Sequence, residues 1–136
     1  MLPPWDDLIA GKGCVLCEPY VEGNRFNIHI ADLSVSTLYL EREQTYRGYC
    51  VLKFTKHHTT GIEFLSDEEY FAFMQDLRRA SKSIQQVTQP DHMNYATLGN
   101  VIPHLHFHIL PRYKNDPRWR APVWMSTMEE APKTYL

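Results

Sequence analysis

The chain has 136 residues, a formal net charge of −2 with 22% charged residues, and a start without a basic region followed by an apolar stretch. This length suits a single domain over residues 1–136, and the near balance of charges argues against a nucleic-acid partner. Because no apolar run is long enough to cross a membrane and no secretion leader is recognisable, we expect a soluble, cytoplasmic protein with no membrane partner.

The distribution of β-branched and aromatic residues predicts five short strands after an irregular amino-terminal segment, residues 1–25. The strands are expected at residues 27–30, 34–40, 49–54, 93–98 and 105–110. A polar connection ending at Gly48 separates the second strand from the third, which is typical of an antiparallel hairpin. Prolines interrupt residues 113–136, so we expect an irregular tail rich in proline and tryptophan at the carboxyl end.

A long helix is predicted between the third and fourth strands. Ser66 and Glu69 have the spacing of a capping box, in which each side chain binds the backbone N–H of the other residue. Apolar side chains recur at helical spacing from Tyr70 to Val87, which indicates a core-facing stripe, and Pro90 ends the helix. The sequence therefore predicts an α+β fold in which an antiparallel sheet of about five strands packs with this long helix and a short helix.

The most informative motif is a row of three histidines, His104, His106 and His108, which alternate with apolar residues. Because side chains alternate across a strand, the three imidazoles are expected on one face of the sheet. A neutral imidazole near physiological pH can act as a nucleophile or exchange a proton. Successive histidines on a strand are about 6.6 Å apart, so two neighbours could share a metal ion but three could not converge on it. We expect the three rings to have different roles.

Two of the three cysteines, Cys14 and Cys17, form a Cys-x-x-Cys motif near the amino terminus. An odd number of cysteines argues against a disulfide framework. The pair could consist of two ordinary thiols, a redox couple or two metal ligands. Cys50 lies in an apolar strand and is expected to be a small buried core residue.

The segment from Asn94 to Arg112, NYATLGNVIPHLHFHILPR, resembles the signature of the histidine triad (HIT) family of nucleotide hydrolases and transferases. The resemblance extends upstream to Gly48 and to the corner formed by His57 and His58. It implies a HIT-like homodimer that cleaves a phosphoanhydride or phosphoramidate bond at the α-phosphate of a nucleotide, often an adenine nucleotide. Dinucleoside polyphosphates and nucleoside phosphoramidates are substrates of this kind.

The resemblance also implies roles for the histidines. The central histidine, His106, would be the nucleophile and would form a nucleotidyl-histidine intermediate that water resolves. His108 would donate a hydrogen bond or a proton to the leaving group. His104 would complete the catalytic row by orienting it.

Three further positions match places where relatives contact their substrate. Asn100 and Asn94 are candidates for the phosphate side of the site. Glu41 falls where many relatives have an aspartate that binds the ribose hydroxyls, and a carboxylate can accept hydrogen bonds from both of them.

A subset of the family binds zinc, and the resemblance implies four ligands in this chain: Cys14, Cys17, His58 and His104. His57 is the alternative to His58. A Cys2His2 set leaves no open coordination position, so this zinc would be structural and no cofactor would be required for catalysis.

Two other functions are compatible with the same residues. One is a nucleotide-binding or sensing module with weak turnover. The other is a metal-dependent hydrolase that uses the histidine row as ligands, which the lack of a nearby carboxylate disfavours. Trp119 and Trp124 in the tail would line the nucleotide pocket, cover a dimer contact or serve packing alone.

Overall fold

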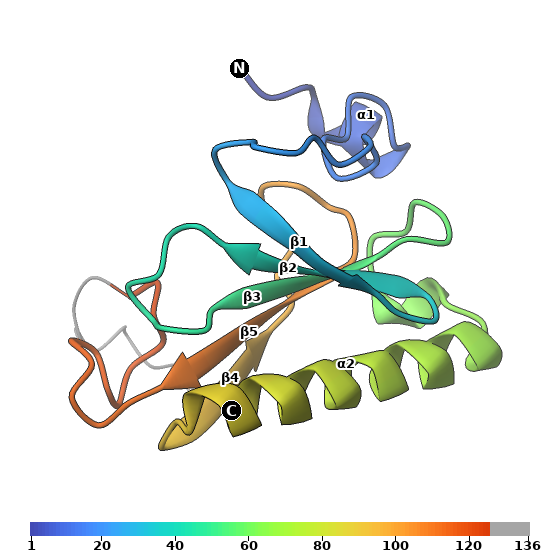
Figure 1. Cartoon of the computed structure of the whole chain (residues 1–136). Helices are drawn as coiled ribbons and strands as arrows, with labels where there is room; N and C mark the ends of the chain where they lie inside the picture. Colours follow the sequence, from blue (N-terminus) through green and yellow to red (C-terminus); the bar gives the residue numbers. More distant parts are fainter. Residues whose placement is uncertain (126–136) are drawn as a thin grey trace, which may run out of the picture.

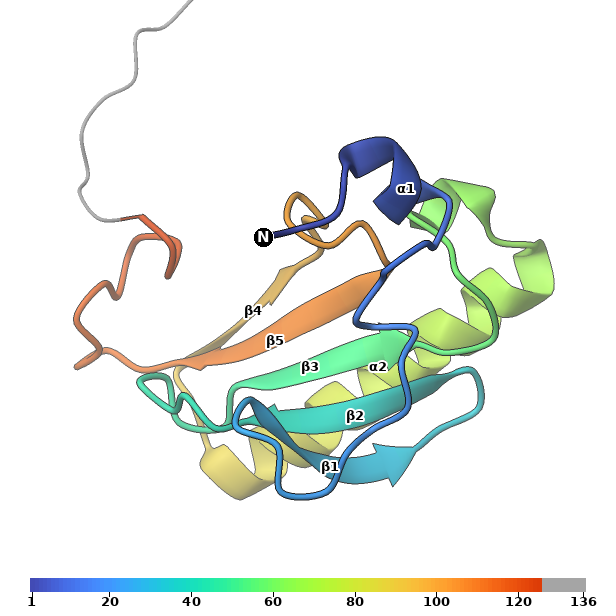
Figure 2. The ribbon, with the colours of Figure 1, turned by 90° about the horizontal axis from the view of Figure 1, so that it is seen from above.

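The computed structural model describes residues 1–125. Its five strands form one antiparallel sheet in the order β1-β2-β3-β5-β4. The strands are β1 (Asn27–Asp32), β2 (Ser36–Glu41), β3 (Cys50–Phe54), β4 (His92–Ala96) and β5 (His106–Arg112). The helices are α1 (Trp5–Ile9), the 3-10 turn η1 (Ile62–Phe64) and α2 (Asp67–Thr88). The helix α2 crosses one face of the sheet, and the amino-terminal segment with α1 lies over the other (Figures 1 and 2).

The α+β fold predicted from the sequence is confirmed. All five strands are present, and no boundary differs from its prediction by more than two residues. The short helix is α1, which lies within residues 1–25, where the sequence predicts an irregular segment; Asp6 and Asp7 in its first turn favour the start of a helix. The last strand begins at His106, so His104 lies just before the strand rather than within it.

The capping box at the start of α2 is also present. The backbone N–H of Glu69 donates to Oγ of Ser66 at 3.1 Å, and the N–H of Ser66 donates to Oε1 of Glu69 at 3.0 Å. The predicted core stripe is wrong at both ends, because Tyr70 is 38% exposed and Val87 is 76% exposed. The buried stripe continues from Ile84 to Thr88, four residues on, and this spacing turns Val87 toward solvent.

The core lies between α2 and the sheet. Its buried members are Leu38, Cys50, Leu52, Phe54, Phe73, Ala80, Ile84, Leu105 and Ile109. The register between β3 and β5 pairs Leu52 with Phe107 on this helix-facing side. The same register pairs Lys53 with His106 and Val51 with His108, so the histidines lie on the opposite face. In the described part of the chain, no helix is both long and apolar enough to span a membrane.

Candidate functional site

Two histidines of the row lie side by side on the face of the sheet that α2 leaves free. The ring centroids of His106 and His108 are 4.9 Å apart, with an interplanar angle of 73°. His104 is buried and precedes the strand, and its ring instead contacts the two cysteines near the amino terminus. The structure therefore divides the predicted row into a pair and a separate third ring.

The central histidine presents its Nε2 atom. Nδ1 of His106 lies 2.6 Å from the backbone carbonyl oxygen of His104. A carbonyl can only accept, so this contact assigns the ring proton to Nδ1 and leaves a lone pair on Nε2. Burial lowers the pKa of His106, which keeps the ring neutral near pH 7.

The last histidine of the row is held by two aromatic side chains. Nδ1 of His108 lies 2.6 Å from the hydroxyl of Tyr49, and the Trp124 ring packs at 4.9 Å between centroids. Burial lowers the pKa of His108 to about 4, and neighbouring His106 adds to the effect. The ring is therefore neutral in the free protein at pH 7.

A cavity of about 820 Å³ opens over this pair of histidines. This volume is in the range of sites that bind small molecules. Its apolar wall comes from the amino-terminal segment and includes Val15, Leu16, Pro19, Val21 and Phe26. Its polar lining includes Glu41, Lys53 and Asn100. Burial raises the pKa of Glu41 to about 7, so the cavity contains a carboxyl group that titrates near neutrality.

One predicted substrate contact lies elsewhere. Asn94 is on β4, and its Oδ1 accepts from Nη1 of Arg112 at 2.7 Å. Asn94 lines a second groove along β4 together with Trp119, and neither side chain lines the cavity over His106. The structure thus brings Glu41 and Asn100 to the histidine pair but does not bring Asn94 there.

Reasoning from the sequence missed two residues that line the cavity, Tyr49 and Lys53. For a third, Trp124, it gave a place in the nucleotide pocket as only one of three alternatives. Tyr49 and Lys53 could have been predicted from the sequence. Tyr49, Val51 and Lys53 alternate along the segment that pairs with the histidine strand, so they share the face of the histidines. A lysine in an otherwise apolar strand is a further signal. Lys53 Nζ lies 5.2 Å from the centre of the Tyr39 ring, inside the cavity.

The position of Trp124 depends on a buried arginine. The guanidinium of Arg112 donates to the carboxylate of Asp116 and to the backbone oxygens of Arg118 and Ala121. These bonds fold the irregular segment after β5 back against the sheet. Residues 113–125 contain no helix or strand, and residues 126–136, the rest of the predicted tail, lie outside the described part of the chain.

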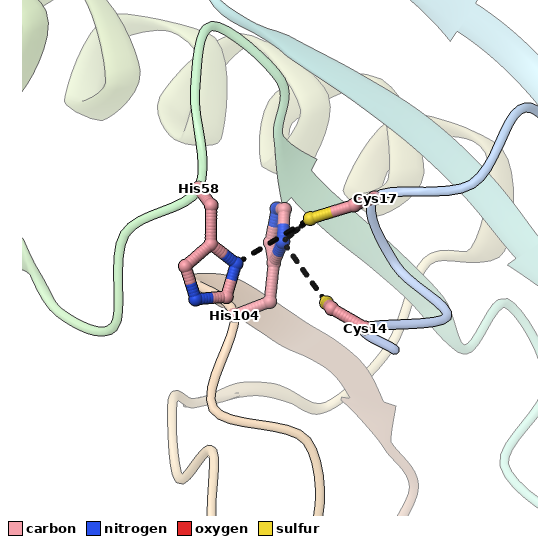
Figure 3. A group of neighbouring side chains, drawn as sticks. All are labelled: Cys14, Cys17, His58 and His104. Atoms are coloured by element: carbon pink, nitrogen blue, oxygen red, sulfur yellow. Dashed lines mark hydrogen bonds between the residues drawn. The ribbon is translucent and has the colours of Figure 1, made fainter. Parts of the chain in front are cut away.

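A second group of side chains could hold a metal ion. One donor atom from each of Cys14, Cys17, His58 and His104 lies within 4.8 Å of the others. Figure 3 shows the four side chains converging from the amino-terminal loop, the corner after β3 and the segment before β5. Sγ of Cys17 is 3.4 Å from Nδ1 of His58 and 3.4 Å from Nδ1 of His104.

The surroundings of the two imidazoles fit a metal ion. Nε2 of His104 donates to the backbone oxygen of Phe54 at 2.8 Å, and Nε2 of His58 donates to that of Ile9 at 3.1 Å. Both rings therefore direct a bare Nδ1 at the thiols, as expected when a second partner orients a metal-ligating histidine. The alternative ligand, His57, instead contacts the Glu69 carboxylate at 2.7 Å.

The fold and these two clusters define an α+β protein with a histidine pair facing a cavity and a separate Cys2His2 group. The chain matches the HIT domain over residues 30–115. It belongs to the HIT family, and this membership points to nucleotide-related hydrolase or transferase activity.

Solved structures agree with this assignment. The chain is similar to a histidine triad protein from Bradyrhizobium japonicum, with 29% identity, a TM-score of 0.69 and 79% of each chain covered. A histidine triad protein from Marinobacter aquaeolei has 26% identity and a TM-score of 0.68 over 79% of this chain and 77% of the other. One from Sinorhizobium meliloti has 21% identity and a TM-score of 0.70 over 80% of each. No curated protein matches the chain significantly.

Proposed function

We propose that this protein cleaves a nucleotide at its α-phosphate through a covalent nucleotidyl-histidine intermediate on His106. The proposal is carried by one observation: His106 faces a cavity with a bare Nε2, while its Nδ1–H is donated to a backbone carbonyl. We propose dinucleoside polyphosphates or nucleoside phosphoramidates, with adenine as the base, as the substrate class.

The chemistry follows from the two ring nitrogens of His106. Nε2 attacks phosphorus without first losing a proton, and the positive charge that develops on the ring is stabilised by the Nδ1–H bond to the carbonyl of His104. His108 is placed to protonate the departing group and then to accept a proton from the attacking water. Splitting the reaction in this way replaces one difficult step with two easier ones.

Substrate contacts are proposed for three side chains of the cavity. Glu41 would accept hydrogen bonds from the ribose hydroxyls, and Asn100 would donate to the α-phosphate. Lys53, opposite His106 in the sheet, would offset the negative charge of the phosphate. Asn94 is left out of this set because its side-chain oxygen already accepts from Arg112.

The Cys2His2 group is proposed to hold zinc as a structural ion. Cys14, Cys17, His58 and His104 supply two thiolates and two imidazoles, a donor set that zinc prefers. The ion would cross-link the amino-terminal segment to the sheet and would have no open position for substrate. Among residues 1–125, no other group of three or more His, Cys, Asp or Glu side chains could hold a metal ion, which argues against the alternative of a catalytic metal on the histidine row. We retain as further proposals a single domain over residues 1–136, a cytoplasmic location and a homodimer.

The replacement His106→Asn tests this function. We expect turnover of an adenosine phosphoramidate to fall by about a thousandfold or more, because the nucleophile is lost. His29→Asn is the matched control: His29 is exposed, contacts Asp32 and does not line the cavity, so its loss should leave the rate unchanged. Turnover by His106→Asn at the wild-type rate would contradict the proposal. Slow turnover by a wild type that still binds nucleotide would favour the sensing alternative.

A further inference from the structure

Tyr49 contacts the histidine to which we assign leaving-group chemistry. Its hydroxyl lies 2.6 Å from Nδ1 of His108, and the ring centroids are 5.9 Å apart. Tyr49 comes two residues before Val51, which pairs with His108, so both side chains lie over the same face of the sheet. The contact joins a residue outside the histidine motif to the last member of that motif.

No other group competes for Nδ1 of His108. The rings of His106 and Trp124 pack against it at 4.9 Å each without a hydrogen bond to this atom. Within residues 1–125, the Tyr49 hydroxyl is the one hydrogen-bond partner of the His108 ring, and α2 lies on the opposite face of the sheet (Figure 1). Two carboxyl groups act electrostatically on Tyr49: Glu41, which also lines the cavity and has the larger effect, and Glu43.

The phenol keeps its proton at neutral pH. Burial raises the pKa of Tyr49, and the negative charge of Glu41 raises it further. A neutral phenol has one donor and free lone pairs, so it can donate to a bare Nδ1 and can also accept from a protonated Nδ1. It can therefore stay bonded to the imidazole in either protonation state.

We propose that Tyr49 is a positioning residue that reserves Nε2 of His108 for the leaving group and then for water, an inference that rests on the function proposed above. A phenylalanine at this position could neither donate to Nδ1 nor accept from it. The ring could then rotate or change tautomer, and Nε2 would be correctly placed for only part of the time.

The proton inventory of the two steps is complete with these groups and one proton that His108 takes from solvent when the substrate binds. The lone pair on Nε2 of His106 forms the bond to phosphorus, and the leaving group departs with the electron pair of the broken bond. His108 enters as imidazolium, because the bound phosphate charge offsets burial, and its Nε2 proton passes to the leaving group. The proton on Nδ1 of His108 stays on that nitrogen throughout and is donated to the hydroxyl oxygen of Tyr49 in a hydrogen bond.

The second step reverses these roles. Nε2 of the now neutral His108 takes a proton from water as the water oxygen bonds to phosphorus. The bond from phosphorus to His106 breaks, and its electron pair returns to Nε2 of that ring. His108 is then an imidazolium again, with its Nδ1–H hydrogen-bonded to the Tyr49 oxygen. When the product leaves, the ring loses one proton to solvent and becomes neutral. Tyr49 transfers no proton in either step, which is consistent with its raised pKa.

The first experiment measures the His108 tautomer in the ligand-free protein by ¹⁵N NMR with labelled histidine. In the wild type we expect one dominant tautomer, with Nδ1 as the acceptor from Tyr49. In Tyr49→Phe the tautomer ratio should shift by about fivefold, the effect of losing one ordinary hydrogen bond. Tyr46→Phe is the matched control. Tyr46, like Tyr49, lies in the connection between β2 and β3, and its buried hydroxyl has no hydrogen-bond partner among the described residues.

The second experiment compares two leaving groups on the same adenosine monophosphate. The rate of the first step is measured as leaving group released in a single turnover, because hydrolysis of the intermediate is common to both substrates. For an alkylamine, which must be protonated to leave, Tyr49→Phe should lower this first-step rate about tenfold with substrate affinity nearly unchanged. For nitrophenolate, which leaves without a proton, the change should be less than about twofold. Tyr46→Phe should alter neither rate.

An unchanged His108 tautomer in Tyr49→Phe would overturn the proposal, whether or not the wild type cleaves nucleotides. Equal losses of the first-step rate with both leaving groups would also overturn it, because they would indicate a general structural defect. A wild-type spectrum in which Nδ1 is not hydrogen-bonded would overturn it without any substitution. A shifted tautomer in a protein that cleaves no nucleotide would support the positioning by Tyr49 and count against the proposed function alone.

Discussion

His104 and His106 are two residues apart, yet they present opposite ring nitrogens. His104 donates Nε2–H to the backbone oxygen of Phe54 and directs Nδ1 at the two thiols. His106 donates Nδ1–H to the backbone oxygen of His104 and directs Nε2 into the cavity. In both rings a backbone carbonyl decides which nitrogen is free. In the proposed function, backbone geometry around chemically identical side chains would therefore make His104 a metal ligand and His106 a nucleophile.

Removing one of the thiols that face His104 should remove the metal site and have the largest effect on stability. We expect wild-type protein to contain about one zinc per chain and Cys14→Ser to contain very little, with the free energy of unfolding lower by about 3 kcal/mol. Metal analysis and thermal denaturation would measure both. Cys50→Ala is the control, since Cys50 is outside the cluster and should leave the zinc content unchanged. Full zinc content in Cys14→Ser would refute the ligand set.

The Glu41 carboxyl group, which lies in the cavity that His106 faces, should make the stability of the protein depend on pH. The pKa of Glu41 is about 7 in the folded protein against 4.5 ordinarily, so between these values the unfolded chain has lost a proton that the folded protein keeps. Stability therefore falls as pH rises through this window. Glu41→Gln should remove this cost and raise the free energy of unfolding by about 1 kcal/mol at pH 8, after allowing for solvent screening, but not at pH 4.

The control and the functional consequence of that change are separate measurements. Glu43→Gln, two residues after Glu41, should produce no gain at pH 8, because the Thr45 hydroxyl holds the pKa of Glu43 below its usual value. Melting temperatures at the two pH values would show the difference. Glu41→Gln should also bind an adenine nucleotide more weakly if Glu41 accepts from the ribose. A Glu41→Gln variant that is less stable than wild type at pH 8 would contradict the buried-carboxyl account.

The smallest effect on turnover is expected from removing the Trp124 ring, which packs against His108. Trp124→Ala should lower turnover only a few-fold, because Trp124 packs against the ring but makes no hydrogen bond to it. Trp119→Ala is the matched control and should have no effect, since Trp119 lies in the groove along β4. Steady-state kinetics would distinguish them. Equal losses in the two variants would indicate that the whole segment after β5, rather than this contact, affects the site.

Local patterns were sufficient for much of this site. The two-residue period of a strand places His106 and His108 on one face, and the capping box marks the start of α2. The choice between His57 and His58 could not be made in this way. It depends on the Glu69 carboxylate, which engages His57 from the first turn of the helix.

Contacts between distant segments account for what the sequence could not predict. Asn94 meets Arg112 across two paired strands, and the side chain of that arginine also fixes where Trp124 lies. Tyr49 reaches His108 because of the register between β3 and β5. Such a register is set by the packing of the whole sheet against α2, so no single segment specifies it.

The most direct test of the central claim is to quench a reaction with the nitrophenyl ester of adenosine monophosphate, whose leaving group needs no proton from His108, in acid-free buffer and determine the mass of the peptide that contains His106. The account predicts an added adenosine monophosphate group on that peptide in His108→Asn, where slow hydrolysis should let the intermediate accumulate, and none in His106→Asn. Continued cleavage by wild type and by His108→Asn with no adduct at any quench time would contradict it.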